Sequence, residues 1–269
     1  MVVLSPAKLN LGLWVLKRRF DGYHEIFTLY HKVSLFDFIY IRKGRFLVET
    51  SLRIPMEKNL VYKALMLMSK ELGFLPEFEV YIEKNIPVGS GLGGGSSNVA
   101  SVLNCVNDLL GKPLERSQLL KIASAVSSDA PFFFFGSSAI GEGRGDIIRE
   151  IQLPKMTFTI ICPNLQASSL RVYSALRPEW LTKIPDSNTI IDCLRKGELN
   201  RLYNALERPA CELYPEVGEV LRYLRALGIE AQLSGSGACV YYAGEPLEKL
   251  RIICSLRGWR IYRVESYGV

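Results

Sequence analysis

The chain has 269 residues, of which 48% are hydrophobic and 22% charged, and its formal net charge is +6. This composition is ordinary for a soluble globular protein, and the length allows two modest cores or one large core. Apolar runs are too short to span a bilayer, and the first residues lead into a strand pattern rather than a signal peptide, so we expect a cytoplasmic protein without a membrane partner.

Charged and metal-binding residue types narrow the range of ligands. Basic residues are scattered and form no continuous basic and aromatic surface, so the positive charge favours phosphorylated small molecules over nucleic acid. The cysteines lack Cys-x-x-Cys spacing and mostly have apolar neighbours, which predicts buried, reduced thiols. With two histidines and no clustered acids, we expect no protein-built metal site. The cysteines are Cys105, Cys162, Cys193, Cys211, Cys239 and Cys254.

The first expected element is a strand over residues 7–16. Leucine and valine alternate with other residues there, which predicts a strand with one buried face. Lys8 and Asn10 share the opposite face, one pleat apart. A lysine in this position usually faces solvent.

A hairpin turn at Asp21-Gly22 precedes the next strands. We expect strands near residues 26–30, 34–41 and 46–50, followed by an amphipathic helix over 59–72 that Gly73 ends. Alternation over 78–83 predicts the strand that leads into a glycine-rich segment.

The glycine-rich segment, residues 86–100, reads IPVGSGLGGGSSNVA. Glycines let a ligand approach the main chain, and Ser96 and Ser97 are expected to cap the helix that follows. A helix N-terminus offers free N–H groups to an anion, so the segment predicts a phosphate site. The alternative is a flexible linker. A dinucleotide fold and a Walker loop are disfavoured, because Lys84–Pro87 interrupts the strand and no Gly-Lys-Ser/Thr follows.

The chain after this segment alternates between helical and strand patterns. We expect a helix over 114–126, a turn at 127–131 that contains Asp129, a short buried strand at Phe132–Phe135 and a turn at 141–145. Further helices are expected over 186–194, 199–206, 217–227 and 247–256, with a helical turn at 173–176. Strands are expected over 158–162, 238–242 and 259–264. The class is therefore α+β, in two domains of residues 1–150 and 151–269.

Three motifs occur in order: residues 6–13 (PAKLNLGL), 87–97 (PVGSGLGGGSS) and 233–237 (LSGSG). Together they resemble the GHMP kinases, which phosphorylate galactose, homoserine, mevalonate and phosphomevalonate. Residues 21–25 and 128–133 are similar to a branch of that family that phosphorylates the 2-hydroxyl of a cytidyl-linked methylerythritol in isoprenoid precursor synthesis. The resemblance implies a ribosomal-protein-like βαβ N-terminal domain and a ferredoxin-like C-terminal domain.

The same resemblance implies roles for individual residues. Lys8 and Asp129 match the catalytic pair, in which Asp129 accepts the hydroxyl proton and Lys8 neutralises charge. The substrate-binding candidates are Asn10, Tyr23, His24, Tyr173, Ser234, Gly235, Ser236 and Gly237. The ATP-binding candidates are Pro87, Val88, Gly89, Ser90, Gly91, Leu92, Gly93, Gly94, Gly95, Ser96 and Ser97, with Asn59 and Lys84 near the adenine.

ATP is the implied co-substrate, with Mg²⁺ arriving on its phosphates and no protein ligand assigned to the metal. One departure from the family pattern is Asn98, where related sequences usually carry aspartate. Two alternatives stay open: another GHMP kinase of the homoserine or mevalonate type, and a non-catalytic RNA-associated module on the same fold. In either enzyme reading we expect a monomer or a weak homodimer.

Overall fold

The computed structural model describes residues 1–52, 54–196, 198 and 202–268, which form two compact units. The first unit comprises Met1–Ala7, Leu35–Ile86 and Gly93–Phe135, and the second comprises Lys8–Ser34, Pro87–Leu92 and Gly136–Val269. The chain therefore passes between the units several times, and it does so on both sides of the short segment Pro87–Leu92. The predicted boundary near residue 150 stays a prediction.

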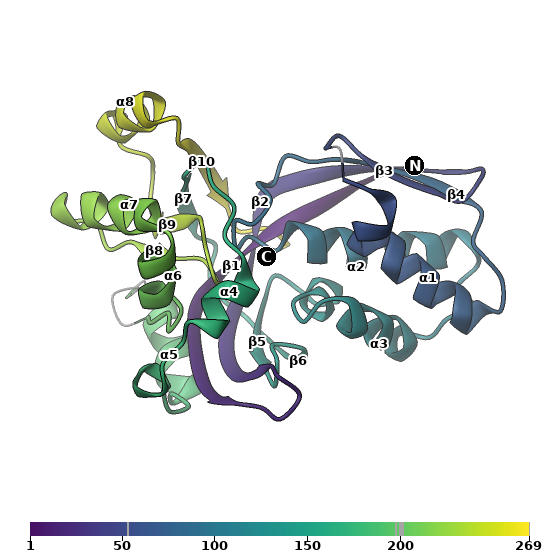
Figure 1. Cartoon of the computed structure of the whole chain (residues 1–269), viewed down its shortest axis with the longest axis horizontal. Coiled ribbons are helices and arrows are strands. Elements are labelled where there is room, and N and C mark those ends of the chain that lie inside the picture. Colours follow the sequence, from purple (N-terminus) through teal and green to yellow (C-terminus); the bar gives the residue numbers. More distant parts are fainter. Residues whose placement is uncertain (53, 197, 199–201, 269) are drawn as a thin grey trace. The chain divides into compact units, whose positions relative to one another are not determined.

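The first unit is a sheet with helices packed on one face (Figure 1). In the sheet, β4 (Phe78–Glu83) pairs antiparallel with β2 (His24–Lys43) and parallel with β3 (Leu47–Thr50). The helices are α1 (Leu60–Leu72), α2 (Gly94–Leu109) and α3 (Arg116–Val126), and the short 3₁₀ helices η1 (Met56–Lys58) and η2 (Ala130–Phe134) complete the unit. Alternate residues of β4, Phe78, Val80 and Ile82, are buried against these helices, as the strand pattern predicts.

Local sequence signals explain where the first two helices begin and end. Asn59 caps α1, because its side chain accepts a hydrogen bond from the Val61 N–H at 2.9 Å, and Gly73 ends the helix at a φ of 77°. The predicted caps of α2 are wrong. Gly93 is the cap, at a φ of 71°, so Ser96 and Ser97 already lie within the first turn.

The predicted strand at Phe132–Phe135 is also wrong. The chain forms the 3₁₀ helix η2 instead, with Pro131 in its first turn and Phe132 and Phe133 buried. Proline is preorganised for the start of a helix because its φ is fixed near the helical value. Burial of the aromatic rings is correctly predicted, but a short apolar run does not distinguish a strand from a helical turn.

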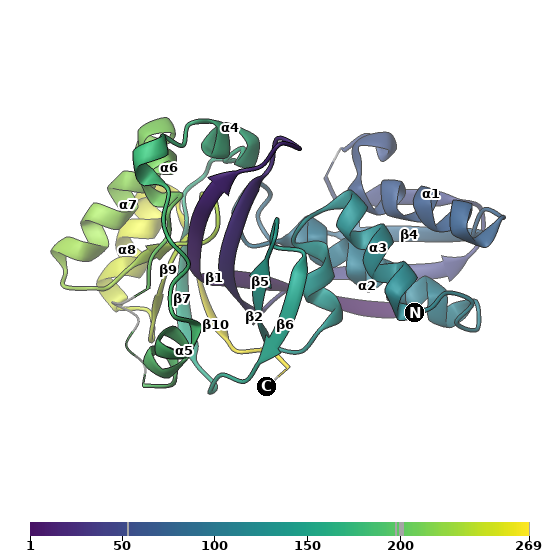
Figure 2. The same ribbon diagram turned by 90° about the horizontal axis from the view of Figure 1, so that it is seen from below.

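The second unit contains two sets of paired strands, shown from below in Figure 2. In one set, β5 (Ser138–Glu142) pairs with β2 and with β6 (Ile147–Ile151), and β1 (Val2–Arg18) also pairs with β2. The other set is an antiparallel sheet in the order β10-β7-β9-β8, made of β10 (Arg260–Glu265), β7 (Thr157–Cys162), β9 (Val240–Ala243) and β8 (Gln232–Leu233).

The second unit contains the helices α4 (Ser169–Ser174), α5 (Ser187–Arg195), α6 (Glu207–Leu213), α7 (Pro215–Ala226) and α8 (Glu248–Arg257), with the 3₁₀ helix η3 (Pro178–Trp180). The helices expected over 186–194, 217–227 and 247–256 agree with α5, α7 and α8 to within two residues, whereas α4 begins before the helical turn expected at 173–176. Val217, Val220 and Leu224 of α7 and Leu250 of α8 share a core with Val240 of β9. Helix α6 is not predicted, since Pro209 interrupts its pattern.

Three further expectations need correction. The strands expected at 26–30 and 34–41 are one continuous strand, β2, because no turn residue separates them. β1 is buried on both faces, with Lys8 and Asn10 each 2% exposed, rather than half-buried. Of the helix expected over 199–206, residues 199–201 lie outside the described residues, and Leu202–Leu206 is not helical.

Two of the six cysteines are not the reduced thiols that we predict. Cys162, the last residue of β7, forms a disulfide with Cys239, which directly precedes β9. The antiparallel pairing of β7 and β9 places these residues opposite each other with their Cα atoms 4.2 Å apart, although 77 positions separate them. The other four, Cys105, Cys193, Cys211 and Cys254, are free thiols, and all except Cys211 are buried.

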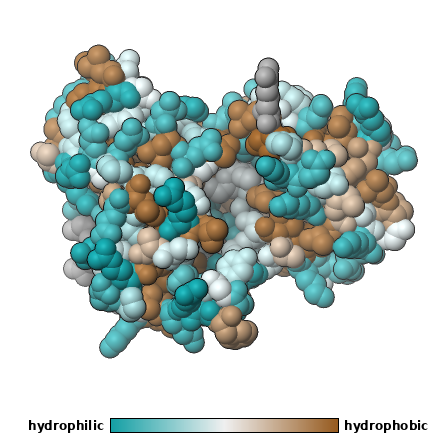
Figure 3. All heavy atoms as spheres, viewed as in Figure 1, coloured by the Kyte–Doolittle hydropathy of each residue, from teal (hydrophilic) through white to brown (hydrophobic). Residues whose placement is uncertain are grey.

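The surface is mixed in character. On the face seen in Figure 3, hydrophobic and hydrophilic residues are interspersed over each unit. Within the part of the chain that the structure describes, no helix combines the length and the apolar character needed to cross a membrane.

Candidate active site

Lys8 lies in the buried part of β1 and points its ammonium group at the glycine-rich segment. Its Nζ donates a hydrogen bond to the Gly91 carbonyl at 2.9 Å and another to Asn10 Oδ1. The main-chain N–H of Lys8 donates to the Leu92 carbonyl at 2.9 Å. The Tyr30 ring lies 5.7 Å from the Lys8 ammonium. A strand residue is therefore held against the segment at both its main chain and its side chain.

Asn10 connects Lys8 to the interior of the second unit. Its Nδ2 donates to Thr28 Oγ1 at 2.8 Å, and Thr28 in turn donates to the Gly12 carbonyl at 2.8 Å. Because the Asn10 amide is fixed in this way, its Oδ1 is directed at Lys8. Lys8 and Asn10 point the same way, as predicted. Thr28 is a positioning residue that the sequence does not reveal, since it is one of many residues in a long strand.

Gly89 and Gly91 allow the glycine-rich segment to pack against other parts of the second unit. Gly91 has a φ of 77°, and a Cβ atom there would lie 2.0 Å from the Ser234 carbonyl oxygen. A Cβ atom on Gly89, at a φ of 65°, would lie 2.8 Å from Gln166 Cβ. Contacts within the protein therefore require glycine at these two positions. The sequence predicts glycine there for another reason, the close approach of a ligand.

A second glycine loop, residues 234–237, contacts the glycine-rich segment. Ser234 Oγ donates to the Gly91 carbonyl at 3.1 Å, and the N–H groups of Ala238 and Cys239 donate to the carbonyls of Gly89 and Ser90. A Cβ atom on Gly235 would lie 2.9 Å from Asn10 Oδ1 and 3.4 Å from Lys8 Nζ. Lys8, Asn10, Gly91 and this loop thus form one cluster. Ser236 instead bonds to Ser169, with their Oγ atoms 2.7 Å apart.

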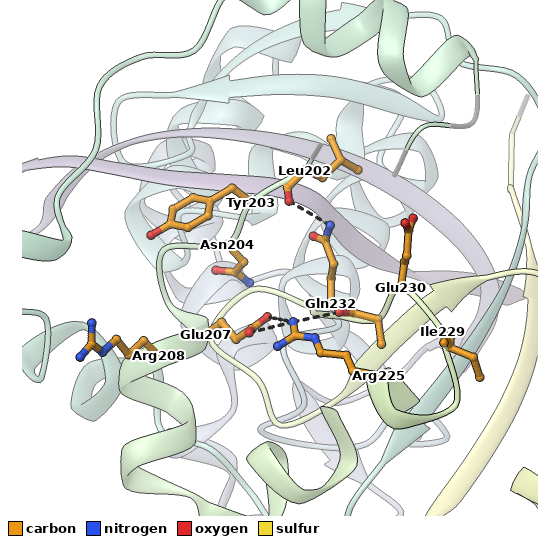
Figure 4. Close-up of a pocket in the computed structure, with 11 residues that line it drawn as sticks. Leu202, Tyr203, Asn204, Glu207, Arg208, Arg225, Ile229, Glu230 and Gln232 are labelled. Carbon is orange, nitrogen blue, oxygen red and sulfur yellow. Dashed lines mark hydrogen bonds and ion pairs between the residues drawn. The ribbon is translucent and has the colours of Figure 1, made fainter. Parts of the chain in front are cut away.

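Asn204 fixes the second glycine loop from a neighbouring pocket (Figure 4). Its Nδ2 donates to the carbonyls of Leu233 and Gly235, both at 2.8 Å, and its main chain bridges to Leu13 of β1. In the same pocket wall Arg225 pairs with Glu207 at 2.8 Å. The sequence does not reveal the role of Asn204, because residues 199–206 have a helical pattern.

In the first unit, the predicted anion site falls at the N-terminus of α2, and anion binding there stays a prediction. No acidic residue lies in its first turn, and the first N–H groups of any helix lack intrahelical acceptors. Ser96 Oγ lies 2.7 Å from Ser127 Oγ, and Ser97 Oγ accepts from Ser5 Oγ at 2.8 Å. The two serines therefore anchor the first turn rather than cap it.

The bond between Ser96 and Ser127 links the first turn of α2 to the segment that contains Asp129. Asp129 lies two residues after Ser127, in a turn that directly precedes η2, and is partly exposed. A partly exposed carboxylate is chemically able to accept a proton from a hydroxyl. Lys8 belongs to the second unit and Asp129 to the first. Their pairing in catalysis stays a prediction.

The two residues expected near the adenine have protein partners in the first unit. Asn59 caps α1, and a Cβ atom on Gly95 would lie 3.2 Å from the next residue of that helix, Leu60. Lys84 forms an ion pair with Asp37 and donates to Asn98 Oδ1 at 2.9 Å. Asp37 is fully buried and is not among the sequence candidates. The contacts of Asn59 and Lys84 with adenine stay predictions.

Two of the aromatic candidates, His24 and Tyr173, contact each other in the second unit. The His24 ring stacks on the Tyr173 ring, with centroids 5.3 Å apart, a distance of direct contact. The Tyr23 ring, 51% exposed, has the Arg144 guanidinium 4.7 Å from its centroid. Burial, and to a lesser extent Arg18, lowers the pKa of His24, which favours the neutral form of this ring.

Comparison with known proteins finds relatives over nearly the whole chain. Residues 59–137 match the family model for the GHMP kinases N terminal domain, and residues 186–255 match that for the GHMP kinases C terminal domain. A 4-diphosphocytidyl-2-C-methyl-D-erythritol kinase of Sulfurihydrogenibium sp. is 42% identical, with 98% of each chain covered. One from Persephonella marina is also 42% identical, over 97% of this chain and 98% of its own. The chain belongs to the GHMP kinase family.

Solved structures agree with the GHMP kinase fold over the whole chain. A crystal structure of 4-(cytidine 5'-diphospho)-2C-methyl-D-erythritol kinase has a TM-score of 0.84 at 34% identity and covers all of both chains. A homoserine kinase from Cytophaga hutchinsonii, at 20% identity and a TM-score of 0.69, shares the fold. The expected α+β GHMP kinase architecture is confirmed. The matched N-terminal range includes Asn59, the N-terminus of α2 and Asp129, whereas Lys8 and Tyr23 precede it.

Proposed function

We propose that this GHMP kinase transfers the γ-phosphoryl group of ATP to the 2-hydroxyl of 4-diphosphocytidyl-2-C-methyl-D-erythritol, in the non-mevalonate route to isoprenoid precursors. The support is the similarity over nearly the full chain to kinases of that name, together with the Lys8 cluster at the glycine-rich segment. It acts on small molecules in the cytoplasm, as a monomer or weak homodimer, without nucleic acid.

In this proposal the protein supplies positioning and charge. Phosphoryl transfer requires aligned groups and neutralisation of developing negative charge more than covalent chemistry. The N–H groups at the start of α2 bind the phosphates, Lys8 neutralises charge on the transferred group, and Asp129 accepts the proton of the hydroxyl.

In this proposal Mg²⁺ reaches the site bound to ATP. In the described ranges, no group of three or more His, Cys, Asp or Glu side chains is placed to hold a metal. The first turn of α2 has no acidic residue, and the Asn98 side chain is bonded to Lys84, Asp37 and Ser5. The nucleotide phosphates are therefore the ligands that we propose for the ion, which neutralises their charge when bound.

Acceptor-dependent ADP formation tests the proposal. We expect rapid ADP release with the cytidyl methylerythritol, little with homoserine or mevalonate, and a phosphomonoester on the 2-hydroxyl by ³¹P NMR. Equal turnover of homoserine or mevalonate would favour another GHMP kinase. No acceptor-dependent ADP formation, together with tight RNA binding, would favour the RNA-associated module.

A further inference from the structure

Asp37, Lys84 and Asn98 form a buried polar cluster in the first unit, beneath the first turn of α2. Lys84 pairs with Asp37 and donates to Asn98 Oδ1 at 2.9 Å. Asn98 Nδ2 donates to Asp37 Oδ2 at 3.0 Å and to Ser5 Oγ at 2.9 Å. The side chains of Lys84 and Asp37 are 8% and 0% exposed, and Asn98 is 3% exposed. Water therefore screens these charges weakly.

The hydrogen bonds of this cluster require an amide at position 98. Asp37 Oδ1 accepts from the N–H groups of Asn85 and Ile86 at 2.8 and 2.9 Å, so its Oδ2 remains for Lys84 and Asn98. Asn98 accepts from the ammonium with its oxygen and donates to the carboxylate with its nitrogen. An aspartate at 98 has no donor for Asp37 and would place two carboxylates beside one ammonium.

The cluster contacts the main chain on both sides of residues 87–93 of the glycine-rich segment. Asp37 holds the main chain at residues 85 and 86, immediately before Pro87. On the other side, a Cβ atom on Gly94 would lie 3.3 Å from Lys84 Nζ and 2.9 Å from Ile86 Cγ2. Because Gly94 is the first residue of α2, a change in the charge or shape of the cluster acts directly on the predicted phosphate site.

We propose that Asp37 and Asn98 are positioning residues for ATP, and that the site requires a single carboxylate, shared between these two positions, to balance Lys84. This inference rests on the proposed binding of ATP at the N-terminus of α2. In this chain the buried carboxylate is supplied by Asp37 of β2, and the amide at 98 keeps the cluster neutral. A second carboxylate would add negative charge beside the phosphates and repel them.

A charge swap tests the proposal. Asn98→Asp adds a carboxylate, Asp37→Asn removes one, and the double variant Asp37→Asn with Asn98→Asp moves it across the cluster. We expect each single variant to weaken binding of a non-hydrolysable ATP analogue at least tenfold by calorimetry, with KM for the acceptor within twofold of wild type. The double variant should bind the analogue more tightly than either single variant but less tightly than wild type, because an amide at position 37 has one oxygen and cannot accept from both the main chain and Lys84.

Asn107→Asp is the matched control, because Asn107 is a buried asparagine on the same helix whose side chain bonds to the main chain of Leu114. It should lower the melting temperature and leave nucleotide affinity unchanged. Wild-type affinity in Asn98→Asp, or a double variant no better than either single variant, would overturn the proposal. So would equal weakening of nucleotide and acceptor.

Nucleotide binding is measured without an acceptor, which separates this inference from the proposed function. A wild-type protein that binds the ATP analogue but does not phosphorylate the cytidyl compound contradicts the proposed acceptor alone. If Asp37→Asn cannot be purified because it leaves Lys84 buried and unpaired, Asn98→Asp and the double variant still carry the test.

Discussion

Lys8 and Asp129 are the residues on which the proposed chemistry depends most. We expect Lys8→Ala and Asp129→Asn each to lower kcat at least about a hundredfold, the scale typical of lost acid–base catalysis. Lys8→Ala should still fold, since Ser234 Oγ continues to bond to the Gly91 carbonyl. Steady-state kinetics and circular dichroism measure both effects.

Lys17→Ala is the control for Lys8→Ala, because Lys17 lies on the same strand but is exposed. Its kcat should equal that of wild type. A kcat near the wild-type value in either Lys8→Ala or Asp129→Asn would remove that residue from the catalytic pair.

The stacked rings of His24 and Tyr173 are the structure's best candidate for a surface that binds the cytosine ring. Stacking of a base on an aromatic side chain contributes about 1–3 kcal/mol. Tyr173→Ala should therefore raise KM for the cytidyl acceptor about tenfold and leave KM for ATP unchanged. Tyr23→Ala should have a smaller effect on the same KM, since the Tyr23 ring contacts Arg144.

Tyr40→Ala, which removes an exposed tyrosine of the first unit, is the control and should leave both KM values unchanged. If Tyr173→Ala raised KM for ATP as much as KM for the acceptor, the rings would not bind the base selectively.

For individual residues, the sequence predicts which side chains are candidates for chemistry better than it predicts which residues they contact. Lys8 and Asn10 are predicted to point the same way because alternation on a strand is regular, and they do. Thr28, Asp37 and Asn204 are not predicted, because each acts through partners far away in the sequence. Asn204 bonds to residues about 30 positions later and Asp37 to residues almost 50 positions later.

Among the elements, the glycine-rich segment is predicted to bind phosphate and also packs against the loop at Ser234. A substitution can measure the packing separately. Gly91 and Gly73 both have a φ of 77°, but a Cβ atom on Gly73 meets nothing within 4 Å, whereas one on Gly91 meets the Ser234 carbonyl. Gly73→Ala should cost about 1–2 kcal/mol of unfolding free energy from the backbone conformation alone. Gly91→Ala should cost at least about 2 kcal/mol more, since main-chain atoms must move.

Denaturant unfolding of the two variants measures this difference. Gly91→Ala should also lower kcat, because the displaced Ser234 loop contacts Asn10 and approaches Lys8. Equal loss of stability in both variants would show that the contact with Ser234 adds nothing to the conformational cost.

The bounds of regular elements follow from the sequence where a cap or a turn marks them. Asn59 and Gly73 delimit α1, and the strand over 78–83 agrees with β4 at both ends. Expectations are wrong where an apolar run is short, as at Phe132–Phe135, or where a helical pattern conflicts with a tertiary contact, as at Asn204. In both cases the local structure depends on contacts with distant residues, which the local sequence does not show.

For the whole molecule, the sequence predicts the fold class and the family through ordered motifs but not the long-range pairings. The disulfide of Cys162 and Cys239 shows why. Neither cysteine has a diagnostic spacing, and only the register of β7 with β9 brings them together. The composition of the two units is another such property, because each unit combines segments that lie far apart in the sequence.

The buried histidine His31 predicts how stability of the whole chain depends on pH. His31 is 0% exposed, its ring nitrogens each lie 2.7 Å from a serine hydroxyl, of Ser138 and Ser266, and the Phe158 ring lies against it. Burial lowers the pKa of His31 to about 4, whereas an unfolded histidine titrates near 6.5. The unfolded state therefore binds the proton first as pH falls, and stability is lost between pH 6.5 and 4.

The full shift corresponds to about 3 kcal/mol, which denaturant midpoints at pH 7, 6, 5 and 4.5 would reveal as a steady decrease. His31→Gln removes the titrating group, so its midpoint should change much less over this range, whatever its stability at pH 7. The chain has one other histidine, and its pKa is lowered in the same direction, so His24→Gln is the matched control. It should retain most of the decrease, because His24 is less buried than His31. A wild-type midpoint that stays constant down to pH 4.5 would contradict the role of His31, and so would a decrease that His24→Gln abolishes.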